Sequence, residues 1–164
     1  MPLNASPPLD RFDLAILDIL QRDNTMPQRA IAQAVHLSAP AVQRRIQRLR
    51  DSGVIRAEVA VLDAAKLGRS LTLTVEVHVH DEHPLRTAAL RQRIDAEPAV
   101  QQCYVITGEA DYLLIIHVAS MAEYDALADR MLRGDDNVRR FRTSVALACL
   151  KAGLQVPLPQ DTPA

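Results

Sequence analysis

The sequence predicts an α+β protein in which an N-terminal winged helix-turn-helix domain precedes a ferredoxin-like βαββαβ domain. Apolar residues recur at helical spacing up to about residue 62, and after that point β-branched runs alternate with two helical stretches. A length of 164 residues is enough for two small domains with cores of their own. We expect these domains at 9–62 and 63–154, between a disordered arm at 1–8 and a disordered tail at 155–164.

The first two helices follow from caps, breaks and apolar spacing. Asp10 is a good N-cap, and Asp13 places a second carboxylate near the positive end of the first helix. Apolar residues between 12 and 20 form one face, and residues 23–27 indicate a break. A short second helix follows, with its buried side made by Ala30, Ile31, Ala34 and Val35.

The segment 39–52 is the most informative helix of the chain. Ser38 is a good N-cap, Pro40 is tolerated in the first turn, and Gly53 ends the helix. Three apolar residues recur at i, i+4 and i+7 and predict a narrow buried stripe: Val42, Ile46 and Leu49. The alternating pattern of 54–62 then predicts a strand or short wing.

The second half predicts the βαββαβ order. Apolar and polar residues alternate cleanly over 70–80, which is typical of a half-buried strand. The remaining segments are a helix at 84–97, strands at 100–107 and 112–118 around a turn at 108–111, a helix at 121–132 and a strand at 138–151. This order is that of the ferredoxin-like fold.

Composition excludes several classes of protein. With 19 Lys+Arg against 20 Asp+Glu, the chain is no uniformly basic nucleic-acid coat protein. No apolar run approaches 18 residues, and residues 1–8 lack the features of a secretory signal, so we expect a cytoplasmic protein without a membrane span. The two cysteines, Cys103 and Cys149, are too few for a disulfide framework and fit a reducing compartment.

Positive charge concentrates on the helix-turn-helix. Segment 28–56 contains six arginines and one acidic residue, a local net charge of +5. Arginine neutralises phosphates or donates to guanine edges, and glutamine can read adenine edges in double-stranded DNA. Because the N-terminal end of a recognition helix enters the major groove, we expect base reading there and phosphate contacts further along. The candidate DNA-binding residues are Ser38, Ala39, Pro40, Gln43, Arg44, Arg45, Gln47, Arg48 and Arg50, with Arg48 and Arg50 on phosphates.

Four stretches carry a family resemblance. Residues 9–17 (LDRFDLAIL) and 37–55 (LSAPAVQRRIQRLRDSGVI) resemble the feast/famine regulators of the Lrp/AsnC family. In the second half, 107–114 (TGEADYLL) and 142–147 (RTSVAL) are similar to the effector-binding domain of that family. The resemblance covers roughly residues 9–154 and implies a bacterial transcription regulator, not an enzyme, that acts on the nucleoid.

The resemblance also implies partners and a second site. It implies a homodimer built through the ferredoxin-like domains, dimers that assemble into octamers, and an amino acid or similar small effector. The implied effector-binding residues are Thr107, Gly108, Asp111, Arg139 and Thr143. The chemistry is reasonable, because a carboxylate suits the ammonium of a zwitterion and backbone N–H groups suit its carboxylate. A purely structural role for Asp111, bonding backbone within its own turn, stays open.

A metal site at the histidines and two other functions are the remaining alternatives. Among His78, His80, His83 and His117, antiparallel pairing would place His117 opposite about residue 73, roughly 15 Å from His78, so we expect surface histidines and no metal site. No cofactor fingerprint is evident. An enzyme similar to the sirohaem decarboxylases, on the same scaffold, is one rival interpretation. An architectural nucleoid protein that needs no effector is the other.

Overall fold

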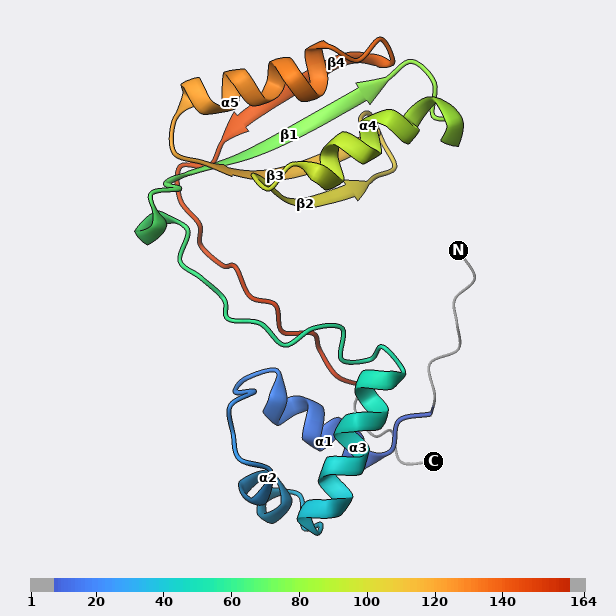
Figure 1. Ribbon diagram of the computed structural model, residues 1–164, viewed down its shortest axis with the longest axis vertical. Coiled ribbons are helices and arrows are strands. Elements are labelled where there is room, and N and C mark those ends of the chain that lie inside the picture. The colour runs from blue at the N-terminus through green and yellow to red at the C-terminus, as the bar shows by residue number, and fades with distance from the viewer. Residues whose placement is uncertain (1–7, 160–164) are drawn as a thin grey trace. The chain divides into compact units, whose positions relative to one another are not determined.

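The computed structural model describes residues 8–159, which form two compact units (Figure 1). Within this range the first unit contains residues 8–60 and 151–159, and the second contains 61–150. The expected disordered arm at 1–8 lies outside the described residues except for Pro8, and the tail at 155–164 does so from residue 160 onward. None of the helices described here is both long and apolar enough to cross a membrane.

The first unit is a three-helix bundle, as predicted. Its helices are α1 (Arg11–Leu20), α2 (Gln28–Ala34) and α3 (Ala39–Asp51). Asp10 caps α1 within a reciprocal capping box that Asp13 completes, which confirms the predicted start. Ala34, expected in the core, is exposed, and Ala32 is buried in its place. The apolar core gathers residues from all three helices: Ile16, Ile31, Ala32, Val35, Val42 and Ile46.

The wing strand expected at 54–62 is absent from the described chain. Residues 54–63 form no regular structure, and the apolar side chains Val59, Val61 and Leu62 are 67–74% exposed. Alternation makes a segment compatible with a strand, but a strand forms only beside another strand that takes up its backbone hydrogen bonds. No strand of the described residues pairs with this segment, so the strand predicted there, one of the two forms expected for it, was wrong.

The second unit has the predicted βαββαβ order. Its elements are β1 (Leu71–Val79), α4 (Pro84–Ala96), β2 (Val100–Val105), β3 (Tyr112–Val118), α5 (Met121–Ala128) and β4 (Val138–Val145). The four strands pair in the order β2-β3-β1-β4, and every neighbouring pair is antiparallel. This is the ferredoxin-like topology that the alternation of strand and helix signals predicted.

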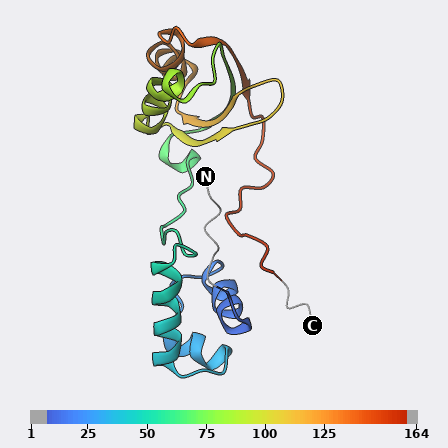
Figure 2. The ribbon, with the colours of Figure 1, turned by 90° about the vertical axis from the view of Figure 1, so that its right-hand side faces the viewer.

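Both helices of the second unit cover the same face of its sheet (Figure 2). The core under them contains the odd-numbered residues of β1 from Leu73 to Val79, together with Leu90 of α4 and Leu127 of α5. The opposite face carries the even-numbered residues of β1, along with Leu113 and Ile115 of β3, which are only half-buried.

Two elements end at least four residues earlier than predicted. The last strand stops at Val145 and not at Lys151, because its partner β1 begins at Leu71, and Ala146 N–H donates the last bond to Thr72 O. The helix predicted at 121–132 keeps α-helical geometry only to Ala128 and continues as a π-helical turn over Asp129–Arg133.

Candidate DNA-binding face and effector site

The α3 helix has the start, the stop and the buried stripe that its sequence predicts. Ser38 Oγ accepts from Ala41 N–H at 3.4 Å, and Gly53 follows the helix with a φ of +75°. The stripe of Val42, Ile46 and Leu49 is buried. The turn before α3 passes through His36 with a φ of +55°, a left-handed conformation that was not predicted and is uncommon at a non-glycine residue.

All nine candidate DNA-binding residues lie on α3 or at its cap. Seven of them are exposed, whereas Ala39 and Arg45 are half-buried. By helical geometry, Arg44 points most directly away from the buried stripe, and Arg45 and Arg48 lie on the flank that faces α1. Gln47 donates its amide to Asp51 at 2.8 Å, which holds it on the outer surface of the helix.

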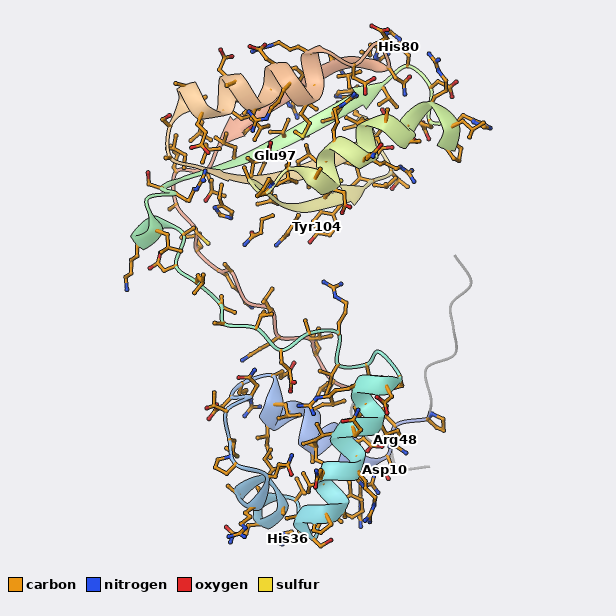
Figure 3. All side chains as sticks on the ribbon, viewed as in Figure 1. Asp10, His36, Arg48, His80, Glu97 and Tyr104 are labelled. Atoms are coloured by element: carbon orange, nitrogen blue, oxygen red, sulfur yellow. The ribbon has the colours of Figure 1, made fainter. Side chains whose placement is uncertain are left out.

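Carboxylates outside α3 pair with three of its four arginines. Arg45 Nη1 lies 2.8 Å from both Asp10 Oδ2 and Asp13 Oδ1, and Arg48 donates to the other oxygen of Asp13. Arg50 donates to both oxygens of Glu58, at 2.9 and 2.8 Å. Figure 3 labels Arg48 and Asp10, which lie near one another where α1 and α3 meet.

The cluster around Asp13 is the feature of this candidate site that sequence reasoning missed. Asp13 is fully buried, although its partners are 32 and 35 residues away in the chain. The hydrogen bond from Arg45 to Asp13, and next the one to Asp10, raises the pKa of the Arg45 guanidinium above its ordinary value. The only sequence signal was the position of Asp13 in the first turn of α1, which explains capping but names no partner on α3.

A shallow hollow opens on the outer side of α3. Its volume is about 320 Å³, and its lining residues are Leu37, Ala41, Arg44, Arg45 and Arg48. Within residues 8–159, Arg44 is the one arginine of this hollow that forms no ion pair. Arg44 and the solvent-facing part of the Arg48 guanidinium suit this concave surface to an anion the size of a phosphate.

Three of the candidate effector residues lie in the loop between β2 and β3. Gly108 has a φ of +127°, which favours glycine at this turn. Asp111 N–H donates to Val77 O at 3.0 Å, and Asp111 Oδ2 accepts from Val79 N–H at 2.7 Å. The Asp111 carboxylate therefore links the β2–β3 loop to the end of β1. It does not bond the backbone of its own turn.

The structure separates the two candidate residues of β4. Arg139 is exposed at the bulge where β4 meets Val79, so it lies at the same end of the sheet as Asp111, on the other side of β1. Thr143 pairs with Val75, four residues or roughly 13 Å further along β1. Its hydroxyl is hydrogen-bonded to Tyr124 of α5, under the helices. The structure thus brings Arg139 toward the loop and leaves Thr143 apart from it.

The histidines occupy unlike environments. His117 pairs with Thr72, within one residue of the predicted register, and its ring nitrogens contact Thr72 Oγ1 and Gln101 Oε1. His78 is only 3% exposed, so the expectation that it lies on the surface was wrong. Across the described part of the chain, no three His, Cys, Asp or Glu side chains are close enough to share a metal ion.

Comparison with known proteins matches both units. Residues 9–56 match the family model described as winged helix-turn-helix DNA-binding, and residues 72–156 match the Lrp/AsnC ligand binding domain. The chain is 36% identical to the glutamate uptake regulatory protein of Zymomonas mobilis over 156 residues, which cover 94% of this chain and 93% of that protein.

Solved structures with the same fold extend this similarity. An AsnC family transcriptional regulator from Agrobacterium tumefaciens matches with a TM-score of 0.84 and 32% identity, over 91% of this chain and 97% of that one. A transcriptional regulator of Neisseria meningitidis in complex with L-methionine matches with a TM-score of 0.85 and 25% identity, over 92% and 97%.

Proposed function

Because the chain belongs to the Lrp/AsnC family of DNA-binding transcriptional regulators, which are not enzymes, we propose that α3 reads its operator and that the β2–β3 loop binds an amino-acid effector. The observation that carries the proposal is the outward surface of α3. This helix has a capped start and a buried stripe on one side. On the other side is Arg44, which forms no ion pair with the described residues.

The DNA-binding residues have different roles in this proposal. Ala39, Pro40, Gln43 and Arg44 contact base edges, because they lie in the first two turns of α3. Ser38 caps the helix, and backbone N–H groups at such an end also suit a phosphate. The remaining candidates serve the DNA backbone or position the helix: Arg45, Gln47, Arg48 and Arg50.

The effector site takes a zwitterion. Asp111 offers the carboxylate oxygen that Val79 N–H does not use, and this charge suits the ligand ammonium. Thr107 and the backbone around Gly108 suit the ligand carboxylate, as does the exposed guanidinium of Arg139 at the same end of the sheet. The complex of the Neisseria relative with L-methionine supports an amino acid as the ligand class. Thr143 belongs to this site only if an effector spans the sheet, since its hydroxyl already binds Tyr124.

The proposal includes a homo-oligomer in the cytoplasm, bound to the nucleoid. The uncovered face of the sheet supports self-association, because Leu113 and Ile115 are half-buried there and Tyr104 is 50% exposed. Dimers that assemble into octamers would present pairs of α3 helices to half-sites about one helical turn apart. Effector binding would then shift the assembly between states with different DNA affinity.

Selection of bound fragments from a genomic library, with and without each amino acid, tests the proposed function. We expect a small set of imperfect palindromes and at least one amino acid that changes their recovery. Equal recovery of unrelated sequences with no amino-acid response would instead support an architectural protein.

A further inference from the structure

The positive charge of the helix-turn-helix is smaller at the surface than the sequence indicates. Segment 28–56 has a net charge of +5, but three of its arginines pair with carboxylates outside the segment. These carboxylates are Asp10, Asp13 and Glu58, and counting them lowers the local sum from +5 to +2. The arginines available to phosphates are therefore fewer than the arginines present.

Asp13 has the central position in this arrangement. Its side chain is 0% exposed, and its two oxygens accept from Arg45, from Arg48 and from the backbone N–H of Asp10. A buried carboxylate is stable only when it is paired and hydrogen-bonded, and both conditions are met here by groups that α3 supplies. The same bonds fix where the two guanidinium groups lie.

Arg45 and Arg48 are held to different degrees. The side chain of Arg45 is 25% exposed, its Nη1 contacts two carboxylates, and its guanidinium carbon lies 5.5 Å from the centroid of the Phe12 ring. The side chain of Arg48 is 49% exposed and uses one terminal nitrogen for Asp13, which leaves the rest of its guanidinium toward solvent. Arg44 forms no ion pair within the described residues and is exposed.

We infer that Asp13 is a specificity-determining residue for DNA binding, because it withholds Arg45 from the phosphates and fixes the direction in which Arg48 meets them. The inference rests on the proposed function of α3 as the surface that faces DNA. Binding to any DNA sequence depends on the number of phosphates that cationic groups neutralise. A carboxylate that removes one cation from that number lowers the affinity for random DNA and leaves the base-reading residues of α3 unchanged.

Salt dependence of binding to a 40-base-pair duplex of mixed sequence measures this number directly. Each phosphate contact contributes about 0.9 to the slope of log affinity against log salt concentration, or about a 3.5-fold change in affinity between 50 and 200 mM salt. We make Asp13→Asn in an Asp10→Asn background, because Asp10 also holds Arg45 at 2.8 Å and asparagine keeps the N-cap of α1. With both carboxylates neutral, we expect the slope to steepen by about 0.9 per DNA-contacting protomer, since Arg45 is released. Asp18→Asn is the matched control, because Asp18 is also a carboxylate of α1 paired with an arginine, Arg22. Its slope should equal that of the unmodified protein.

Two arginine variants keep the inference testable if this double variant does not fold, which circular dichroism would reveal. Arg45→Gln should leave the slope unchanged, whereas Arg48→Gln, which removes a proposed phosphate contact, should reduce it by about 0.9. An equal reduction by both variants would overturn the inference while supporting α3 as the DNA-binding surface. No reduction by either variant would overturn the inference and the proposed surface together. A folded double variant with an unchanged or shallower slope would also overturn it.

Discussion

Asp111 has two roles in the structure and the proposal, and paired substitutions separate them. Its Oδ2 accepts from Val79 N–H at 2.7 Å, and Val79 is only 8% exposed. Asp111→Ala leaves that donor without a partner, at a cost of about 1.5–3 kcal/mol for a bond to a charged acceptor. Asp111→Asn keeps an acceptor oxygen and should cost about 1 kcal/mol. The second unit spans 61–150, and in a unit of this size each kcal/mol lowers the melting temperature by about 4–8 °C.

Calorimetry with and without an amino acid measures both roles. An effector at one hundred times its Kd stabilises the unmodified protein by about 2.7 kcal/mol, and a hundredfold weaker Kd reduces this to below about 0.5 kcal/mol. We expect Asp111→Asn to lose most of this stabilisation, since a neutral amide does not hold an ammonium as a carboxylate does. Asp136→Asn is the control, because Asp136 is an exposed carboxylate next to β4. An unchanged melting temperature for Asp111→Ala would refute the structural argument, and a full effector response of Asp111→Asn would refute the proposed ligand contact.

The remaining predictions concern the cap of α1, the core of the second unit and a cysteine. Asp10→Ala should destabilise the first unit by about 0.5–2 kcal/mol in thermal melts, because it removes the N-cap of α1; full stability at pH 7 would contradict this. Burial raises the pKa of Asp10, but the bond from Asp13 N–H and the Arg45 guanidinium more than offset this and hold it below 3.8. The stabilisation from Asp10 should therefore be complete above pH 3.8 and be lost as the pH falls below it, in an acid titration followed by circular dichroism. Leu127→Ala should cost about 2–5 kcal/mol in denaturant unfolding, since Leu127 is fully buried. Burial raises the pKa of the Cys103 thiol above 9.0, so in a Cys149→Ser variant the rate of alkylation should keep rising above pH 9, and a plateau at lower pH would argue against it.

Features that depend on neighbouring residues were predictable from the sequence. The caps Asp10 and Ser38, the stripe of α3 and the alternation of β1 each involve residues within a few positions of one another, and all are present. The order of strands followed from the ferredoxin-like pattern, which placed His117 within one residue of its observed partner. Local periodicity therefore predicted the elements and most of their pairing.

Features that depend on distant partners were not predictable in this way. The segment 54–62 has the alternation of a strand but lies beside no other strand of the described chain. The pairing of Asp13 with two arginines of α3 requires the contact between α1 and α3, which no spacing rule specifies. The separation of Thr143 from Asp111 was not predictable either, because it depends on the register of β4 on β1.

The two outer strands of the sheet differ in a way that bears on solubility. Within residues 8–159, β2 and β4 each pair along one side only, so each leaves backbone groups open to a further strand. The β4 edge carries the exposed arginines Arg139, Arg140 and Arg142, whose mutual repulsion opposes the stacking of identical chains. The β2 edge has Tyr104 and Val105 exposed, and its main irregularity is a bulge between Val100 and Gln102. In concentrated or partly unfolded samples, non-native aggregation of this protein should therefore begin at β2, and Val105→Lys should suppress it.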